Sequence, residues 1–381
     1  MNTPLRIAYL IKKLEYGGAE MQLMTVAREQ VRNGHQVVIM TLQQAEPAFI
    51  QDMEHAGIPV HCHRFDSPFH LPTTVFEIHR LLQRYQPDVV HSHMFHSNMV
   101  ARILYPFMRK PVFVCTAHNI KEGSKHRDRL YRLTDGLCDV TTNVSQAAVR
   151  RYNEDGLVKN NACLLIENGI DTERFSADVG ARDQYRRELG VEDKFVWLSV
   201  ASLTRQKDFP NMLHGFQDVL NSNPASHLFI AGDGPEREAV KQLVGKLDLA
   251  PNVTLLGNRK DTVSLYAMAD GFVMSSSWEG LPIVLLEALS CSLPCVVTDV
   301  GGNRDLVVSG ENGFVVPPAS HKELAKAMKQ LMQLPAERLC SLQDYGRRHI
   351  VKGYGIASAA KRWIDLYSLL IRNRLSDGVK Q

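Results

Sequence analysis

The feature that most constrains the fold of this chain is a regular alternation of short apolar runs with segments of helical length. In the first half we predict strands over 5–11, 36–42, 58–62, 88–91, 112–116, 139–144 and 163–166. The second half adds strands over 195–201, 227–231, 253–256, 271–275, 294–298 and 314–316. Strands that are apolar throughout and separated by helices are typical of parallel sheets covered on both faces. The alternation therefore predicts an α/β fold made of doubly wound units.

Hydrophobic spacing places several of the helices. One is predicted over 19–33, where Leu23, Val26, Ala27 and Val31 recur at helical intervals before Asn33-Gly34 ends it. In the second half we predict helices at about 208–221, 235–248, 282–291 and 320–333. Near the C-terminus an apolar stripe predicts an amphipathic helix over 359–371 that packs on a domain, formed by Trp363, Leu366, Tyr367 and Leu370.

The strand pattern stops once and starts again, which indicates two domains. At about 150 residues per domain, a chain of 381 residues holds two or three. The polar stretch 171–193 separates the two series of strands. We therefore predict domains over 1–180 and 181–354.

Composition excludes several classes of protein. The 44 basic and 41 acidic residues give a net charge of +3, too balanced for a nucleic-acid protein that binds mainly by charge. The seven cysteines are scattered and never spaced C-x-x-C, so we expect reduced thiols rather than disulfides or a zinc site. No run approaches the roughly 18 apolar residues of a membrane span, and Lys12 and Lys13 follow the first run too early for a secretory signal. We expect a cytoplasmic protein that could still touch a membrane surface.

Ligand-binding loops are expected where the strands end, because the carboxyl ends of parallel strands meet at a crevice. The loop after the first strand contains Gly17-Gly18-Ala19-Glu20 and opens a helix, so its amides could approach an anion closely. It lacks the G-x-G-x-x-G spacing of dinucleotide-binding loops, and a plain glycine-rich turn is an equal alternative. The segment 232–235 is either a similar ligand loop or the start of a helix with Pro235 in its first turn.

The segment 275–302 carries two carboxylates at an informative spacing. Glu279 precedes a Gly-Leu-Pro turn, and Glu287 follows about two turns along a helix that begins near Pro282. This spacing would place one acid in a loop beside a ligand and the other on a helix that faces the same cleft. Glu287 stands in an apolar run, where a buried acid needs a hydrogen-bonding partner. The alternative is a pair of carboxylates on the surface.

Histidines and basic residues gather in the first half. His91, His93 and His118 follow predicted strands, where they are either structural or face a ligand. No third metal ligand stands at a convincing spacing and no D-x-D occurs, so we expect no metal. Between 121 and 132 five cations outnumber two acids, Lys121, Lys125, Arg127, Arg129 and Arg132 against Glu122 and Asp128. This segment is a solvated face or a contact with anionic lipid.

Taken in order, these signals resemble glycosyltransferase family 4, a large group of retaining enzymes with the GT-B fold. The resemblance centres on Glu279 and Glu287 and covers nearly the whole chain. It includes the segments 17–20, 87–93, 116–119, 168–171, 206–208, 231–235, 256–257, 293–294 and 301–302. It implies two Rossmann-like domains that face a cleft, the first binding the acceptor and the second the nucleotide-sugar. It also implies that the C-terminal helix, 355–373, crosses back to the first domain.

The resemblance implies a catalytic group of Glu279, His118 and Lys207. Glu279 would contact the transferred sugar, and His118 would lie beside the sugar and the acceptor. Lys207 would bind the donor diphosphate, because a cation interacts strongly with an anion in a cleft that holds little water. The backbone amides of Gly17 and Gly18 would also donate hydrogen bonds to this diphosphate.

The remaining donor contacts are also implied by the resemblance. The amides of Gly280 and Leu281 would lie beside the sugar, and Glu287 would bind the ribose hydroxyls. The loop with Gly257 and Arg259 would border the base.

Two positions depart from the family pattern. The family usually has Arg five residues before the lysine, where this chain has Ser202. Either Arg205 takes over that role, or it is exposed to solvent and the amides of Gly17 and Gly18 suffice. The family also often has Gly where Ser292 stands, a change we expect packing to tolerate.

These expectations describe a retaining hexosyl- or N-acetylhexosaminyltransferase. Its donor would be a nucleotide-sugar, expected to be UDP-linked, and its acceptor a saccharide, expected to be lipid-linked. It would serve bacterial surface polysaccharide synthesis (O-antigen, capsule or exopolysaccharide), at the inner face of the cytoplasmic membrane, without a metal cofactor and without nucleic acid. The alternatives are a GT-B nucleotide-sugar 2-epimerase and an inactive nucleotide-sugar-binding scaffold. The sequence does not identify the donor sugar, the acceptor, the linkage or the oligomeric state.

Overall fold

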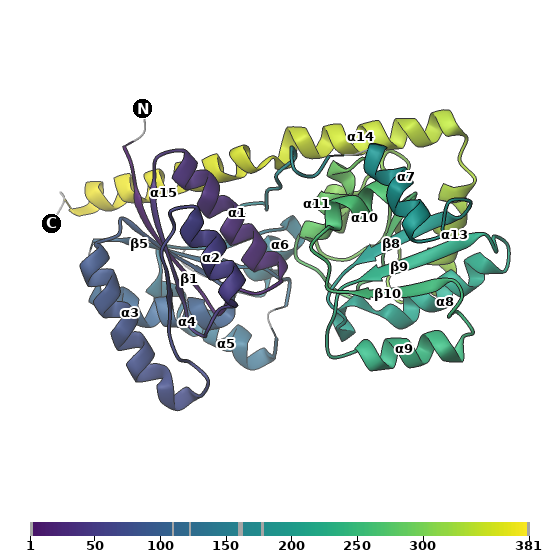
Figure 1. Ribbon diagram of the computed structural model, residues 1–381. Coiled ribbons are helices and arrows are strands. Elements are labelled where there is room, and N and C mark those ends of the chain that lie inside the picture. The colour runs from purple at the N-terminus through teal and green to yellow at the C-terminus, as the bar shows by residue number, and fades with distance from the viewer. Residues whose placement is uncertain (1–2, 109, 122, 159–162, 177–178, 379–381) are drawn as a thin grey trace. The chain divides into compact units, whose positions relative to one another are not determined.

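The computed structural model describes residues 3–108, 110–121, 123–158, 163–176 and 179–378 (Figure 1). The chain divides into two compact units, unit 1 (1–169 with 356–381) and unit 2 (170–355). The division follows Gly169, whereas the sequence pattern placed it after residue 180. The polar stretch 171–193 lies within unit 2 and contributes a helix, α7 (Val179–Glu188).

Unit 1 is built on a seven-stranded parallel sheet in the order β3-β2-β1-β4-β5-β6-β7. Its strands are β1 (Arg6–Ile11), β2 (Gln36–Thr41), β3 (Val60–Cys62), β4 (Val89–His93), β5 (Val112–Ala117), β6 (Val140–Asn143) and β7 (Leu164–Leu165). The chain winds outward from β1 to β3 and then returns to place β4 on the other side of β1. The boundary between β1 and β4 is therefore the switch point, where loops diverge and ligands bind in open α/β sheets.

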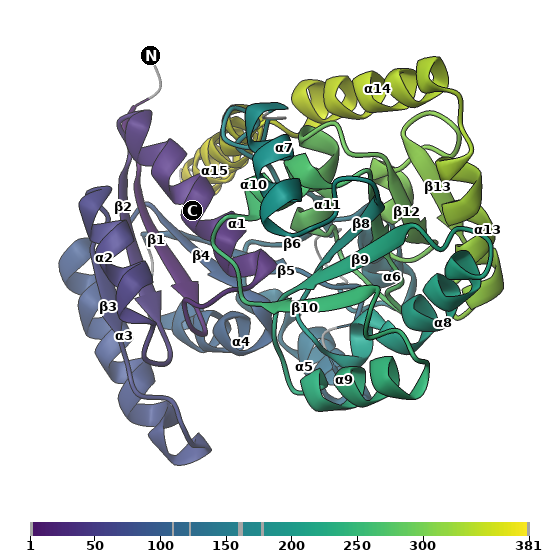
Figure 2. The same ribbon diagram turned by 45° about the vertical axis from the view of Figure 1, so that its right-hand side comes forward.

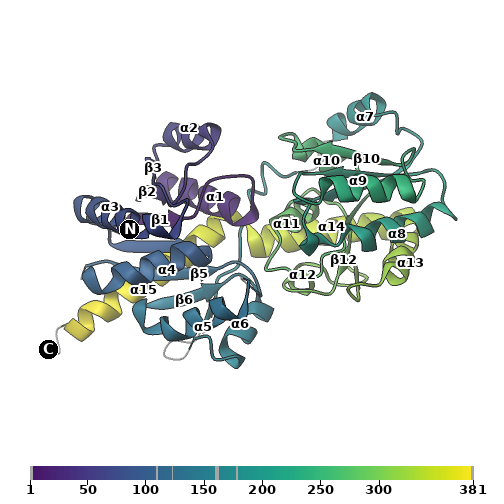
Figure 3. The same cartoon turned by 90° about the horizontal axis from the view of Figure 1, so that it is seen from below.

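Helices cover both faces of this sheet. They are α1 (Gly18–Arg32), α2 (Pro47–His55), α3 (Leu71–Tyr85), α4 (Met94–Leu104), α5 (Lys125–Leu133), α6 (Gln146–Glu154) and α15 (Ile356–Gly378), with short 3-10 turns η1 (Pro68–His70), η2 (Tyr105–Phe107) and η3 (Asp135–Leu137). One core cluster joins the sheet to α1, α2 and α15, and a second joins it to α3 and α4. Figure 3 shows α3, α4 and α5 in turn across the second face.

The C-terminal helix α15 packs on unit 1, as the sequence predicted. Trp363, Leu366 and Tyr367 are buried in the core beside α1. The hydroxyl of Tyr367 lies 2.6 Å from Nδ1 of His91 at the centre of the sheet, and Nε2 of His91 lies 2.6 Å from the hydroxyl of Thr116. The predicted stripe on 359–371 therefore fixes the end of the chain to the strands of the first half.

Unit 2 has a six-stranded parallel sheet in the order β10-β9-β8-β11-β12-β13 (Figure 2). Its strands are β8 (Phe195–Val200), β9 (Ser226–Ala231), β10 (Val253–Gly257), β11 (Gly271–Met274), β12 (Cys295–Thr298) and β13 (Gly313–Val316). The chain again winds outward, from β8 to β10, and then returns to the other side of β8. The switch point of unit 2 thus lies between β8 and β11.

The helices of unit 2 also occupy both faces of its sheet. Besides α7 they are α8 (Phe209–Leu220), α9 (Arg237–Lys246), α10 (Thr262–Met268), α11 (Ile283–Ser290), α12 (Asn303–Leu306), α13 (His321–Met332) and α14 (Ala336–Tyr354), with the 3-10 turn η4 (Arg205–Lys207). The core on one face is formed by α8, α9 and α13 against the strands.

All strands predicted from the sequence occur, each to within two residues at either end. The pattern gave no prediction for α14.

None of the helices in the described part of the chain is both long enough and apolar enough to cross a membrane.

Candidate active site

The most deeply buried ion pair among the described residues of unit 2 lies at its switch point. Lys207 ends η4, in the loop after β8, and Glu279 lies in the loop after β11. Nζ of Lys207 is 2.6 Å from Oε1 of Glu279, and only 14% and 6% of the two side chains are exposed. A buried charge is costly unless an opposite charge lies beside it, so the ammonium of Lys207 and the carboxylate of Glu279 stabilise each other.

Hydrogen bonds between the two loops fix this geometry. The hydroxyl of Ser275 donates to the carbonyls of Lys207 and Asp208, at 2.8 and 2.9 Å. The side-chain amide of Gln206 donates to the carbonyl of Trp278 at 2.8 Å and to Oε2 of Glu279 at 3.3 Å. Both carboxylate oxygens of Glu279 are therefore held by neighbouring residues of the first loop.

The turn after Glu279 is held by close backbone packing. Gly302 donates its amide to the carbonyl of Gly280 at 2.7 Å. Gly301 has a φ of +55°, and a Cβ there would collide with the carbonyls of Glu279 and Gly280. Glycine is needed at 301 for both reasons. Gly280 and Leu281 are buried beside Glu279, where the sequence predicted sugar-binding amides.

Glu287 has the hydrogen-bonding partner that its apolar surroundings require. It lies on α11, and the hydroxyl of Tyr266 donates to Oε2 of Glu287 at 2.7 Å. Burial raises the pKa of Glu287 to about 7, although the bond from Tyr266 and the charge of Arg174 act in the opposite direction. Burial and the adjacent carboxylate raise the pKa of Tyr266 well above its usual value. A carboxyl that titrates near neutrality is typical of functional sites.

The other predicted donor residues of unit 2 lie on more open loops. Arg205 and Ser202 are exposed, and the side chain of Arg205 has no hydrogen-bond or ion-pair partner among the residues that the structure describes. Arg259 is held by Asp261, with Nε 2.8 Å from Oδ1. Gly257 has a φ of +67°, and its carbonyl accepts the amide of Gly232 at 2.8 Å.

In unit 1 the predicted phosphate loop also begins at a switch point. Gly17 is the N-terminal cap of α1, in extended conformation, and it makes no side-chain cap bond to the first amides of the helix. Gly18 is exposed. The buried carboxyl of Glu20 lies against Gly17, in the space that a Cβ would occupy. Burial raises the pKa of Glu20 to about 7, with repulsion from Glu15 adding to the effect.

Two of the predicted histidines form a direct pair. Nδ1 of His93, at the end of β4, lies 2.8 Å from Nε2 of His118, after β5, and the rings stack at 5.1 Å. Burial lowers the pKa of His118 to about 4 and that of His93 well below its usual value, so both rings are neutral at pH 7. Nε2 of His93 is buried with no hydrogen-bond partner in the described structure.

Both halves of the chain match known family models. The Glycosyltransferase Family 4 model matches residues 16–174, and the model of glycosyl transferases group 1 matches residues 181–349. The chain is a family 4 glycosyltransferase.

Two relatives of this glycosyltransferase have names that specify a nucleotide-sugar donor. It is 26% identical over 313 residues to the UDP-Gal:alpha-D-GlcNAc-diphosphoundecaprenol alpha-1,3-galactosyltransferase of Escherichia coli, covering 79% of this chain and 80% of that one. It is 24% identical to a GDP-mannose-dependent alpha-(1-6)-phosphatidylinositol monomannoside mannosyltransferase of Mycolicibacterium smegmatis, covering 92% and 95%.

Solved structures show that the glycosyltransferase has the GT-B fold. HepE of Anabaena, in complex with UDP-glucose, matches with a TM-score of 0.85 at 22% identity, covering 96% of this chain and 99% of that one. WaaG, a glycosyltransferase involved in lipopolysaccharide biosynthesis, matches with a TM-score of 0.75 at 18% identity, covering 95% and 99%. The fold predicted from the sequence is confirmed.

The predicted site residues of the glycosyltransferase fall into two groups. Unit 2 brings together Lys207 with Glu279 and Gly280, and it places Glu287 on the helix that follows; unit 1 carries Gly17, Gly18 and His118. Their roles toward a donor stay a prediction. Three contributions were missed. Gln206 is too ordinary a residue to single out, Tyr266 is brought to Glu287 only by tertiary packing, and His93 was named without its pairing to His118.

The described residues of the glycosyltransferase contain no group of three or more His, Cys, Asp or Glu side chains arranged to hold a metal ion. Its described cysteines are all free thiols.

Proposed function

We propose that this glycosyltransferase transfers a sugar from a UDP-sugar to a lipid-linked saccharide with retention of configuration. The observation that carries the proposal is the buried pair of Lys207 and Glu279, beside the turn at Gly280 at the switch point of unit 2. In such a place the cation can stabilise the departing diphosphate, and the carboxylate can stabilise the positive charge that develops on the sugar.

The donor and acceptor classes are supported by similar proteins. HepE binds UDP-glucose, and the name of the E. coli relative specifies UDP-Gal and a diphosphoundecaprenol-linked acceptor. By analogy we assign this chain a UDP-sugar donor, a lipid-linked saccharide acceptor and a role in bacterial surface polysaccharide synthesis.

In the proposed mechanism each residue acts on one part of the donor. Lys207 and the amides of Gly17 and Gly18 stabilise the charge that develops on the leaving diphosphate. Glu279 contacts the sugar, and Glu287 accepts hydrogen bonds from the ribose hydroxyls. Attack from the face that the diphosphate leaves, through an ion pair, accounts for retention without a protein nucleophile.

We further propose that transfer needs no metal ion. The sequence has no D-x-D, and fixed cations and amides can stabilise the diphosphate directly. Activity should therefore survive excess chelator. A complete loss that magnesium restores would contradict this part of the proposal.

Peripheral contact with an anionic membrane is the last part of the proposal. In the segment 121–132, Lys121, Lys125 and Arg129 are exposed and have no ion-pair partner in the described structure, and Glu122 lies outside the described residues. On α5, which carries Lys125 and Arg129, Leu130 and Leu133 are 43% and 69% exposed. Cations beside exposed leucines suit the surface of an anionic bilayer. The protein should sediment with anionic vesicles at low salt and be released at high salt, whereas equal binding to neutral vesicles would contradict the charge argument.

A release assay tests the central proposal. Purified protein is incubated with UDP-sugars, with and without a lipid-linked saccharide, and the release of UDP and the fate of the sugar are measured. We expect UDP release that depends on the acceptor, and its loss in Lys207→Ala. Conversion of the sugar without transfer would identify a 2-epimerase instead, and binding without any turnover would identify a scaffold.

A further inference from the structure

A surface pocket of about 450 Å³ lies at the outer edge of the unit 1 sheet, away from its switch point. It is lined by the edge strand β3 and by α3. Its polar lining includes Arg80 and Arg84 from α3, His61 and His63 from the strand side, and one acid, Glu77. Glu77 already accepts a hydrogen bond from Nδ1 of His63 at 3.1 Å.

The two arginines are cations without compensation. Arg80 and Arg84 are one helical turn apart, so their guanidinium groups project from the same face of α3. Both are exposed, and neither side chain has a hydrogen-bond or ion-pair partner in the described part of the chain. Like charges at this spacing destabilise a helix. An anion that bridges two guanidinium groups would remove that repulsion, and phosphate has the geometry to do so.

Exposed aromatic side chains extend this cationic face. Phe76 stands one turn before Arg80 and is 63% exposed, and Phe69, in the turn just before α3, is 91% exposed. Rings as exposed as these gain free energy on entering an apolar phase. The two arginines can bind the phosphate of a phospholipid head group. The two rings beside them can enter the apolar part of the interfacial layer of the bilayer.

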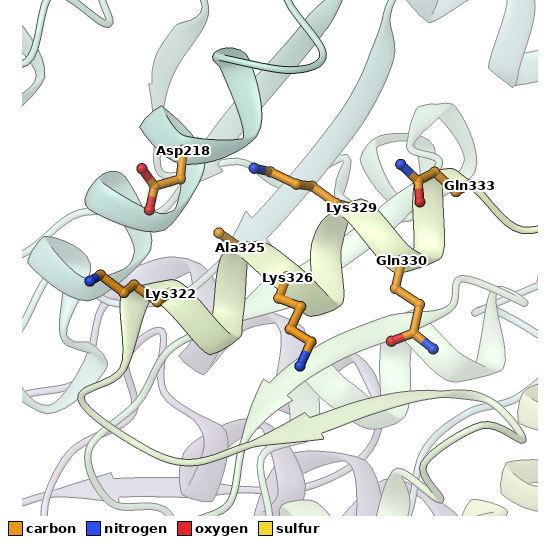
Figure 4. A pocket seen from close by; sticks show the side chains of 7 residues that line it. All are labelled: Asp218, Lys322, Ala325, Lys326, Lys329, Gln330 and Gln333. Atoms are coloured by element: carbon orange, nitrogen blue, oxygen red, sulfur yellow. The ribbon is translucent and has the colours of Figure 1, made fainter.

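A second pocket of similar size, on unit 2, differs from the pocket between β3 and α3 in the side chains around it. It lies between α8 and α13 and is lined by Lys322, Lys326, Lys329 and Asp218. Figure 4 shows the lysine side chains pointing in different directions from α13, with Asp218 on the facing helix. None of the large hydrophobic side chains that are exposed in the described structure lies on α8 or α13, whereas α3 carries the exposed Phe76 beside its pocket. It is a solvated helix face, and it provides a control.

We propose that the pocket between β3 and α3 binds the phosphate head group of an anionic membrane lipid, through Arg80 and Arg84, while Phe69 and Phe76 enter the bilayer surface. The proposal rests on the proposed function, because a lipid-linked acceptor brings the enzyme to a membrane. It adds a lipid site on the face of unit 1 that also carries α4 and α5. One bilayer can therefore be contacted by α3 and by α5.

The test measures binding of the full chain to vesicles of phosphatidylglycerol and of phosphatidylcholine. Arg80→Gln/Arg84→Gln should weaken binding to phosphatidylglycerol vesicles on the order of 30-fold, as expected for two cations at an anionic surface. Phe69→Ser/Phe76→Ser should weaken binding to both kinds of vesicle. The control Lys326→Gln/Lys329→Gln removes the same charge from the other pocket and should bind as the wild type does.

The outcomes separate the possible ligands. Equal binding by the arginine variant and the wild type would overturn the proposal, and so would an equal loss in the lysine control, which would show that only net charge matters. If inorganic phosphate binds through the two arginines while vesicle binding is unchanged in their variant, the pocket is a site for free phosphate and the lipid assignment is wrong. UDP release with a water-soluble acceptor should be unaffected by the arginine variant, so failure of the lipid site and failure of the transferase proposal are distinguishable.

Discussion

The amine of Lys207 and the carboxylate of Glu279 lie 2.6 Å apart, although 72 residues separate them in the chain. Their strands, β8 and β11, are neighbours only because the winding of the sheet reverses between them. The pair compensates two mostly buried charges. A bound diphosphate would compete with Glu279 for the amine of Lys207, and Glu279 would then be free to face the sugar.

The first prediction concerns the two carboxylates that define the site. Glu279→Ala should lower kcat about 10²–10³-fold and change the donor KM much less, because in the proposed mechanism Glu279 acts on charge that develops in the transition state. Glu287→Ala should instead weaken donor binding, by about 1.5–3 kcal/mol for each ribose hydrogen bond lost. Steady-state kinetics test both changes, with circular dichroism to verify the fold. Glu337→Ala, which removes an exposed acid from α14, is the control, and unchanged kinetics in both site variants would refute the assignment.

The second prediction follows from the pKa of Glu287, which burial raises to about 7. The ionised form can accept two hydroxyl donors from ribose, whereas the protonated form is a poorer acceptor. Donor affinity should therefore rise as the pH is increased from 6 to 8. Because the bond from Tyr266 lowers this pKa, Tyr266→Phe should shift the titration to higher pH. Calorimetric titration with a UDP-sugar measures the effect, and a pH dependence that persists in Glu287→Gln would assign it to another group.

The strands and their arrangement in two doubly wound α/β units could be predicted from the sequence because each strand here is a short apolar run between helices. β4 and β5, for example, are buried along their whole length, so no alternation of polar residues obscures them. Some helices were harder to predict from the sequence. α7 lies in a stretch rich in Arg and Asp, and it is held by ion pairs of Arg182 and Arg186 with Asp270, 2.5 and 3.0 Å long. Such tertiary ion pairs leave no periodic signal in the sequence.

The candidate site was predictable in its motifs and not in its contacts. Glu287 was expected to need a partner, but only the packing of α10 against α11 identifies Tyr266 as that partner. Likewise, Gln206 becomes informative only because the loops after β8 and β11 meet. Pairings between residues far apart in sequence depend on strand order, which a single sequence does not encode locally.

The third prediction uses the buried carboxyl of Glu20, whose pKa burial raises from 4.5 to about 7. Since the unfolded chain releases this proton near pH 4.5 and the folded chain only near pH 7, the stabilising contribution present below 4.5 is lost as the pH rises through 7. Glu20→Gln keeps the group neutral, so it should stabilise the protein at pH 8 by up to about 3 kcal/mol and have little effect at pH 4. Thermal unfolding across this range tests the effect. The exposed Glu54→Gln on α2 is the control, and an equal gain at both pH values would contradict burial as the cause.

The fourth prediction concerns the missing family arginine at Ser202. The side chain of Arg205 is exposed and has no partner among the described residues, so it is available to a phosphate oxygen from the loop that also carries Lys207. If it has taken over the role, Arg205→Ala should cost roughly 2–4 kcal/mol of transition-state stabilisation, and Ser202→Arg on that background should restore part of it. Comparison of kcat/KM for the three enzymes decides the matter. Wild-type turnover and donor affinity in Arg205→Ala would instead assign the second phosphate contact to the amides of Gly17 and Gly18.

The last prediction concerns the bond between His93 and His118. Both rings are neutral at pH 7, so their 2.8 Å contact holds a single proton, and each ring fixes the tautomer of the other. Nε2 of His93 is buried without a partner in the described structure, and a buried N–H there would cost more than a buried lone pair. We therefore expect His93 to carry its proton on Nδ1 and to donate it to Nε2 of His118.

His93→Leu removes this donor, so His118 should lose its single tautomer and kcat should fall roughly tenfold, the cost of one hydrogen bond. His93→Asn places an amide N–H near the position of Nδ1 and should recover most of the activity. A purely structural role for His93 predicts the opposite order, because leucine fills a buried site better than asparagine. Nitrogen NMR of labelled histidine reports the tautomer directly, with the exposed His55→Gln as the control. An unchanged His118 signal together with wild-type turnover in His93→Leu would show that His93 does not position His118.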